Sequence, residues 1–238
     1  MGNENGVWIM HGLKADDLGC LLTVDALTDF INKVGFLPLF KNDIPGFSAE
    51  EYTIAENWWC GDPKCDPWEW RSIIAGRGDI AYGKFFDKKA GFISKEWLPY
   101  FVNHRRDGYD FEGLWEDQKA SLREKKIMDQ FDDDSEIFSN ELKVRAGFGK
   151  GGEKNYDGVL TNLQMNLHLC VRDFQQKINK KGEPYGWAIA VYSKPEHLWG
   201  SEYAMSAFNE SPEKSCERIR AQMLSLYPGV TEKQLARI

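Results

Sequence analysis

The sequence lacks the features that mark membrane-spanning and secreted proteins. No apolar run approaches the roughly 18 residues that a transmembrane helix needs. The first residues, MGNENGVWIMHGLKADD, contain no basic region followed by an apolar one. The five cysteines form an odd, scattered set at positions 20, 60, 65, 170 and 216. We therefore expect reduced thiols, a cytoplasmic protein and no association with a membrane.

Paired metal ligands are also scarce. Cys60 and Cys65 form a C-x4-C pair, but no second pair of cysteines or histidines accompanies them. Structural zinc takes four ligands, usually as two close pairs. The stretch GFGKGG from Gly147 fits G-x-G-x-x-G, yet the sequence predicts a helix before it rather than the strand of a dinucleotide-binding unit. We therefore predict neither a metal ion nor a cofactor, and no grouping of residues identifies a catalytic side chain.

Positive charge is scarce overall and gathers in one part of the chain. The formal net charge is −7. Residues 1–139 carry 16 basic and 26 acidic side chains, whereas residues 140–200 carry 9 and 6, and residues 201–238 carry 5 and 5. This distribution argues against general binding of polyanions and favours a local contact with nucleic acid in the later part of the chain.

Helix-start signals, by contrast, are frequent. Ser121-Leu-Arg-Glu124 and Thr231-Glu-Lys-Gln234 are capping boxes. Asp66 followed by Pro67 has the residue types of an N-cap and a first helical position, so a helix should begin there. On that helix Trp70 shares a face with two isoleucines, which predicts that it is in the core. The chain as a whole is predicted to be mainly α with short β-hairpins.

From Ser121 onward the predicted elements follow a recognisable order. Three helices are expected, starting near Ser121, Ser139 and Asn155, and the strand-like runs LHLCVRDFQQK and YGWAIAVYS follow them. Three helices and then a hairpin is the order of a winged helix, and we predict tandem winged-helix units. The expected parts are a helical, tryptophan-rich, winged-helix-like part (1–118), a winged-helix domain (119–200) and C-terminal helices that pack back (201–238).

The winged-helix pattern predicts which residues meet double-stranded DNA. The third helix of such a motif enters the major groove, where asparagine and glutamine side chains can pair with adenine. Lysines in the preceding loop and at the hairpin tip would contact phosphates. A solvated helix face is the alternative for the polar residues of the third helix. The predicted nucleic-acid-binding residues are Lys150, Lys154, Asn155, Tyr156, Thr161, Gln164, Lys177, Lys180 and Lys181.

The segment ENWWCGDPKCDPWEWRS, residues 56–72, holds four of the nine tryptophans. After Asp66 it becomes the helix described above, and before Asp66 it is a turn-rich loop. The segment is either a structural brace or a ligand pocket that includes Trp59, Trp68 and Arg71. Arg105 and Arg106 are further candidates for such a pocket. In so acidic a half of the chain, they would otherwise form internal ion pairs.

Two stretches resemble a known family. WWCGDPKCDPWEWRSIIAGRGDIAYGKFFDKKAGFISKEWLPYFVNHRRDGYDF and ELKVRAGFGKGGEKNYDGVLTNLQMNLHLCVRDF, followed by GEPYGWAIAVYS, look like bacterial AlkZ-related proteins, distant relatives of the AlkZ winged-helix DNA glycosylases. The resemblance covers residues 20–200 and implies several winged-helix units around a DNA-facing surface. For the true glycosylases it implies excision of damaged bases with a Gln-x-Gln or Gln-x-Asp motif near the N-terminal part of the fold.

The sequence departs from that motif. No glutamine precedes Gln118, and Gln130-Phe131-Asp132, which fits the letters, lies in a different region. The leading prediction is therefore a winged-helix DNA-binding protein that lacks the catalytic glutamine motif. One alternative is a divergent DNA glycosylase or other nucleobase enzyme. The other is a module that binds a protein or a small ligand.

Overall fold

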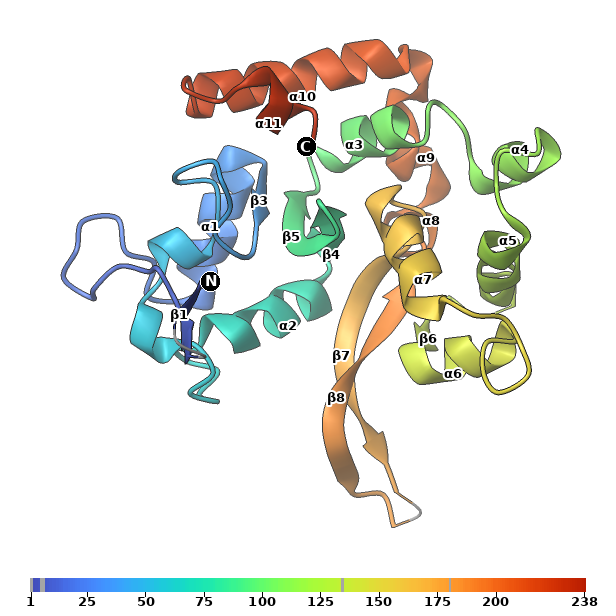
Figure 1. Ribbon diagram of the computed structural model, residues 1–238, viewed down its shortest axis with the longest axis horizontal. Coiled ribbons are helices and arrows are strands. Elements are labelled where there is room, and N and C mark those ends of the chain that lie inside the picture. The colour runs from blue at the N-terminus through green and yellow to red at the C-terminus, as the bar shows by residue number, and fades with distance from the viewer. Residues whose placement is uncertain (1, 5–6, 134, 180) are drawn as a thin grey trace. The chain divides into compact units, whose positions relative to one another are not determined.

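The computed structural model describes residues 2–4, 7–133, 135–179 and 181–238 (Figure 1). Its contacts divide the chain into two compact units, which we describe separately. Unit 1 comprises Met1–Leu98 and Cys216–Ile238, and unit 2 comprises Pro99–Ser215. Lys180, one of the predicted phosphate contacts, lies outside the described residues. No helix in the described part of the chain is long and apolar enough to cross a lipid bilayer.

Unit 1 combines helices with a three-stranded antiparallel arrangement in the order β3-β5-β4. Its elements are β1 (Gly2–Glu4), β2 (Val7–Ile9), α1 (Val24–Val34), β3 (Phe36–Pro38), two 3₁₀ turns (Glu50–Tyr52 and Ala55–Asn57), α2 (Pro67–Arg77), β4 (Ile80–Phe86), β5 (Lys89–Ser94), most of α10 (Pro212–Leu226) and α11 (Glu232–Leu235). Trp70 on α2 is 1% exposed, which confirms that it belongs to the core.

A tight hairpin joins β4 to β5. Phe86 pairs with Lys89, so only Asp87 and Lys88 form the turn, with φ angles of 49° and 62°. Positive φ at both central residues is the geometry of a type I′ turn, whose twist matches that of the strands it joins. The turn allows β4 and β5 to run for seven and six residues, and all but one residue of β4 are buried.

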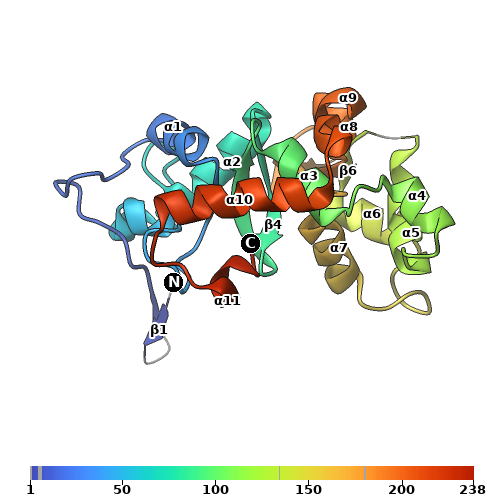
Figure 2. The same cartoon turned by 90° about the horizontal axis from the view of Figure 1, so that it is seen from above.

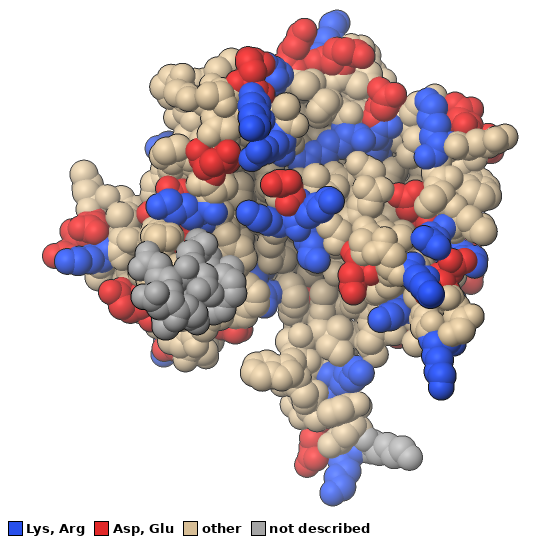
Figure 3. Space-filling view, in the orientation of Figure 1, with Lys and Arg blue, Asp and Glu red and all other residues tan. Residues whose placement is uncertain are grey.

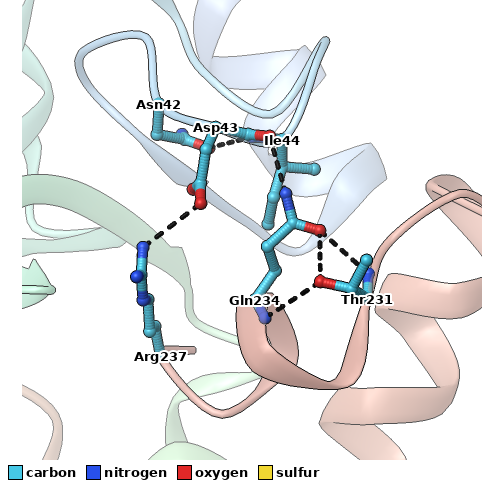
Figure 4. A network of polar contacts seen from close by, with 6 residues as sticks. All are labelled: Asn42, Asp43, Ile44, Thr231, Gln234 and Arg237. Atoms are coloured by element: carbon cyan, nitrogen blue, oxygen red, sulfur yellow. Dashed lines mark hydrogen bonds and ion pairs between the residues drawn. The ribbon is translucent and has the colours of Figure 1, made fainter.

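The C-terminal residues of unit 1 dock on the loop around Asp43 (Figure 4). Gln234 Nε2 donates to the carbonyl oxygen of Asp43 at 2.7 Å, and Arg237 pairs with the Asp43 carboxylate at 3.2 Å. Thr231 and Gln234 form the predicted capping box of α11. The same glutamine side chain therefore caps its own helix and holds it against residues far away in the sequence.

Unit 2 contains the elements that the sequence predicts as helix, helix, helix and hairpin, with a short strand after the first helix. Helix α5 packs against α6 and α7 (Figure 2), and the strand order is β7-β8-β6. Its elements are α3 (Leu98–Arg105, with Leu98 in unit 1), α4 (Phe111–Glu116), α5 (Leu122–Met128), a 3₁₀ turn (Asp129–Phe131), β6 (Ile137–Phe138), α6 (Ser139–Arg145), α7 (Tyr156–Met165), β7 (Cys170–Ile178), β8 (Pro184–Ser193), α8 (Pro195–Trp199), α9 (Ser201–Ala204) and a 3₁₀ turn (Ser206–Asn209).

The prediction of a mainly α protein with short hairpins, built from tandem winged-helix units, is wrong. Helix and strand are mixed, and six strands, β3 to β8, build antiparallel sheet. The two hairpins are not short: β4 and β5 have seven and six residues, and β7 and β8 have nine and ten. The physical reason is that β4 and β5 are buried on both faces over most of their length, so no alternation of apolar and polar residues marks them as strands in the sequence.

Candidate nucleic-acid interface

The β7–β8 hairpin projects from the rest of unit 2 (Figure 1). Its register shifts partway along: Gln175 pairs with Ile189, whereas Lys177 pairs with Tyr185. The extra residues lie on β8, where Gly186 has a φ of 73° and its carbonyl oxygen accepts from Gln176 Nε2 at 2.7 Å. A bulge of this kind re-aims the side chains beside it.

The bulge and the hairpin end carry exposed apolar side chains. Trp187 is 93% exposed, Ile178 61% and Tyr185 50%. A single exposed apolar residue is ordinary, but three on one narrow projection make a surface suited to a partner. In the predicted strand YGWAIAVYS, Trp187, Ile189 and Val191 occupy alternate positions, as residues on one face of a regular strand do, and the bulge breaks that alternation. The glycine inside the strand, just before Trp187, is the sequence signal for this feature.

A shallow groove of about 830 Å³ runs beside the hairpin. Hairpin residues line one side of it, including Gln175, Gln176 and Lys177, and residues at the start of α6 line the other, including Asn140. Lys181 is exposed at the hairpin end. Figure 3 shows basic side chains on the hairpin among mostly uncharged neighbours. The groove thus offers amide and ammonium groups, which are suited to phosphate and sugar oxygens.

The glycine-rich loop between α6 and α7 is held by one of its own carboxylates. Glu153 pairs with Arg123 at 3.0 Å and with Lys126 at 2.8 Å. The hydrogen bonds from these two cations, that of Lys126 first, lower the pKa of Glu153. Lys150 and Lys154 are exposed on this loop, and neither is in an ion pair with a described residue. The loop is therefore anchored on one side and presents two available cations on the other.

The four residues predicted to contact bases lie at the start of helix α7 or along it, and three of them are buried. Asn155 is exposed at the helix start, with a φ of 66°. Tyr156 is buried and donates its hydroxyl hydrogen to the Ser139 carbonyl oxygen at 2.8 Å. Thr161 is 8% exposed and Gln164 1%, and the Gln164 amide donates to the Leu160 carbonyl oxygen at 3.2 Å. These three side chains lie in the interior of unit 2, so the surface of α7 is formed by other residues.

The tryptophan-rich loop of unit 1 is a stack of aromatic rings. The ring of Phe40 lies 5.6 Å from that of Trp58 and 6.3 Å from that of Trp68. Trp59, which is 45% exposed, lies 6.4 Å from Trp68. The Arg71 guanidinium lies 3.7 Å from the ring centroid of Trp68 and is buried. Trp59, Trp68 and Arg71 are thus brought together, as the pocket hypothesis requires.

Asp66 organises this loop. Its side chain is fully buried and accepts three backbone hydrogen bonds: from Trp68 at 2.8 Å, from Gly61 at 2.9 Å and from Trp59 at 3.0 Å. The first confirms the predicted N-cap of α2, and the other two fold the preceding loop back onto the helix start. One carboxylate therefore fixes both the helix and the loop that carries Trp59.

Arg105 and Arg106 belong to unit 2 and make internal contacts. Arg106 is 2% exposed, forms an ion pair with Glu196, and donates to the Leu167 carbonyl oxygen at 2.5 Å. Arg105 donates to the Met165 carbonyl oxygen at 3.0 Å and lies over the Phe101 ring. Both arginines therefore support the packing of α3 within unit 2. The five candidate pocket residues are divided between the two units.

Two sequence motifs remain to be placed: the C-x4-C cysteine pair and the segment Gln130-Phe131-Asp132. The Sγ atoms of Cys60 and Cys65 lie 3.8 Å apart. Within the described residues, no group of three or more histidines, cysteines and acids could hold a metal ion. In Gln130-Phe131-Asp132, Gln130 donates to the Lys126 carbonyl oxygen at 3.1 Å and Phe131 is fully buried. Asp132 lies 3.7 Å from Lys194 in an ion pair.

A buried histidine, which sequence reasoning missed, lies near the Arg106 ion pair. His168 is 3% exposed and packs edge-on against Phe111, with ring centroids 5.2 Å apart. Burial, reinforced by the nearby Arg106 charge, lowers the pKa of His168 well below its usual value. The histidine therefore stays neutral in the folded chain at pH values where the unfolded chain takes up a proton. No periodicity in the run NLHLC distinguishes it from a strand residue.

This difference predicts a pH-dependent stability. Below pH ~6.5 the unfolded state binds one more proton than the folded state at His168, so the free energy of unfolding falls as pH falls, by up to about 1.4 kcal/mol per pH unit. Urea unfolding at pH 7.0 and 5.5 measures the loss. His168→Gln should reduce it by about 1 kcal/mol, whereas the same change at the exposed His197 should leave it unaltered. An equal loss in wild type and His168→Gln would contradict the assignment.

Comparisons with known proteins give one family. The model of a family described as AlkZ related matches residues 21–238. No curated protein and no solved structure matches the chain. The match extends over nearly all of both units and continues past residue 200, where the resemblance seen in the sequence stopped. The chain belongs to the AlkZ-related family.

Proposed function

We propose that this protein binds duplex DNA through unit 2, with the β7–β8 hairpin as the principal contact. The order α5, β6, α6, α7, β7, β8, with the short strand paired to β8, supports a winged-helix interpretation of this segment. In such motifs the helix before the hairpin approaches the major groove and the hairpin contacts the neighbouring backbone or groove. Membership of the AlkZ-related family, whose description relates it to AlkZ, favours the same class of partner.

The observation that carries the proposal is the exposed indole of Trp187 on a projecting hairpin. An indole that is 93% exposed contributes almost nothing to the folded core. It can instead stack on a base, or enter a groove as an apolar wedge, as aromatic side chains of nucleic-acid-binding proteins do. Gln175 and Gln176 lie on the paired strand and can donate hydrogen bonds to sugar and phosphate oxygens.

The charge arrangement supports a phosphate contact despite the acidic composition. Lys150, Lys154, Lys177 and Lys181 all belong to unit 2, and none is in an ion pair with a described residue. Several other lysines of this unit, such as Lys125 and Lys126, are paired with carboxylates. Available cations thus lie on the loop and the hairpin, where a nucleic-acid backbone would lie. The three buried residues of α7 have no part in this interface.

Binding of a fluorescent 20-base-pair duplex, measured by anisotropy as salt is raised, tests the proposal. Each phosphate contact that is lost should reduce the slope of log K against log salt by about 0.9, so Lys177→Ala/Lys181→Ala should reduce it by about 2. Trp187→Ala should weaken binding by about 1–3 kcal/mol, with the salt slope unchanged.

Matched variants come from unit 1. Lys64→Ala and Trp59→Ala remove an exposed lysine and a half-exposed tryptophan of unit 1, which are not among the proposed contacts, and both should leave binding and slope unchanged. Saturable binding with none of the unit 2 substitutions affecting it would place the interface elsewhere. The absence of binding even at low salt would refute DNA binding itself.

A further inference from the structure

Unit 2 contains a half-enclosed cavity of about 240 Å³ that has no part in the hairpin interface. Its apolar wall is formed by Phe111, Met128 and Met205, of which the first two are buried. Elements from five parts of unit 2 contribute to it, from the start of α4 to α9. A concave apolar wall with a few polar groups is the usual form of a small-molecule site.

The polar lining of the cavity is dominated by acceptors. Four carboxylates line it, from Asp110, Glu112, Asp132 and Glu196, against one ammonium group, that of Lys194. Burial would raise the pKa of Glu196, but the Arg106 charge and hydrogen bond outweigh it and lower that pKa, so the carboxylate is ionised at neutral pH. Three of these carboxylates are in ion pairs: Glu112 with Lys125, Asp132 with Lys194 and Glu196 with Arg106. The four carboxylates still exceed these three cations, so the remaining negative charge disfavours an anionic ligand and attracts a cation.

His168 supplies an independent sign that the cavity is built for a ligand. This side chain lines the cavity, is 3% exposed, and its Nδ1 atom makes no hydrogen bond to any described residue. A buried polar atom left without a partner costs roughly 1–3 kcal/mol, so such atoms call for a specific explanation. Because the ring is neutral, it does not repel a positively charged ligand.

We propose that this cavity binds a small planar organic cation whose N–H groups donate to the carboxylates. The planar body would lie against Phe111 and the two methionines, and the cationic end would face Asp132 and its neighbours. The volume admits a single ring with a short substituent but not a nucleotide, whose phosphate would also be repelled. A metal ion is disfavoured, since no group of described histidine, cysteine and acidic residues has metal-binding geometry.

Three probes of one shape and different charge test the proposal: benzamidine, benzamide and benzoate. Isothermal titration of the full chain should give saturable binding of benzamidine, about tenfold weaker binding of neutral benzamide, and no binding of benzoate. Nearly equal affinities for the three probes would show that the cavity selects by shape alone. They would overturn the proposal that its ligand is a cation. The absence of saturable benzamidine binding would overturn the site.

Two pairs of variants locate the bound probe. Asp132→Asn should weaken benzamidine binding about fivefold, because it removes one carboxylate and leaves Lys194 without that partner. Asp133→Asn removes the same charge from a neighbouring residue outside the cavity lining and should have no effect. Ser201→Phe should block the cavity from its exposed rim, whereas Ser206→Phe, at an exposed serine outside the lining, should not.

These substitutions avoid the buried core, so a loss of binding cannot be attributed to unfolding, and circular dichroism checks each variant. If Asp132→Asn and Ser201→Phe both bind benzamidine as wild type does, the probe occupies another site and the proposal fails. The outcome is independent of DNA binding, which none of the four substitutions should alter.

Discussion

Replacing Asp66 with alanine should lower the free energy of unfolding by about 3 kcal/mol. The carboxylate is fully buried and accepts from the backbone N–H groups of Trp59, Gly61 and Trp68. Alanine would remove the N-cap of α2 and leave the two loop donors without their acceptor. Because Trp59 and its loop depend on the same side chain, local order should be lost along with global stability. Urea denaturation followed by tryptophan fluorescence measures both.

Two variants show whether the effect is specific. Asp66→Asn keeps the oxygen that accepts from Trp59 and Trp68 but places an amide group opposite the Gly61 N–H, so it should cost about half as much as alanine. Asp62→Ala removes an exposed aspartate of the same loop, whose carboxylate accepts from the Lys64 N–H, and should cost about 0.5 kcal/mol or less. Equal losses for Asp66→Ala and Asp62→Ala would contradict the role given to Asp66.

Replacing Arg106 with methionine should destabilise the protein by about 3–5 kcal/mol. The substitution leaves the largely buried Glu196 carboxylate without its cation and the Leu167 carbonyl oxygen without a donor. Removing one partner of a buried pair is costly because the other charge stays buried. The free energy of unfolding from urea denaturation at pH 7 gives the effect.

The double variant Arg106→Met/Glu196→Met should recover most of that loss, since no uncompensated charge remains. Arg220→Met, which breaks the exposed ion pair with Glu232, should change stability by less than about 1 kcal/mol. If the double variant is as unstable as the single one, the cost comes from packing of the arginine stem rather than from its charge.

The local helix signals were the most reliable part of what the sequence predicts. Asp66, Ser121 and Thr231 each cap a helix where the residue types predicted it. Such signals depend on a carboxylate or hydroxyl within three residues of a backbone donor, so they need no knowledge of the rest of the fold.

The β4–β5 hairpin could not be predicted in this way. Type I′ turns are usually marked by Asn-Gly or Asp-Gly, because glycine adopts positive φ without strain. Here Asp87 and Lys88 occupy the two positions, so the usual marker is absent. The surrounding strands are buried on both faces over most of their length, and such strands have no alternation to detect.

The candidate interface was partly predictable. The lysines of the loop and hairpin followed from the predicted order of three helices and a hairpin, together with the local excess of basic residues. The polar residues of α7 did not, because Gln164 satisfies its amide within its own helix and is then free to be buried. Polarity in the sequence therefore indicated a need for hydrogen bonds rather than exposure to a partner. Trp187 was missed because a bulge, not the alternation of the strand, decides where it lies.

The division of unit 1 into two stretches has a consequence for biosynthesis. Gln234 and Arg237 reach Asp43 across sequence separations of 191 and 194 residues. On a ribosome, all of residues 99–215 emerge before the stretch that completes unit 1. Unit 2 can therefore fold first, and its compaction shortens the span that the late contacts must close. Until the C-terminal residues are synthesised, the loop around Asp43 lacks the segment that docks on it. This uncovered surface is what a chaperone would bind.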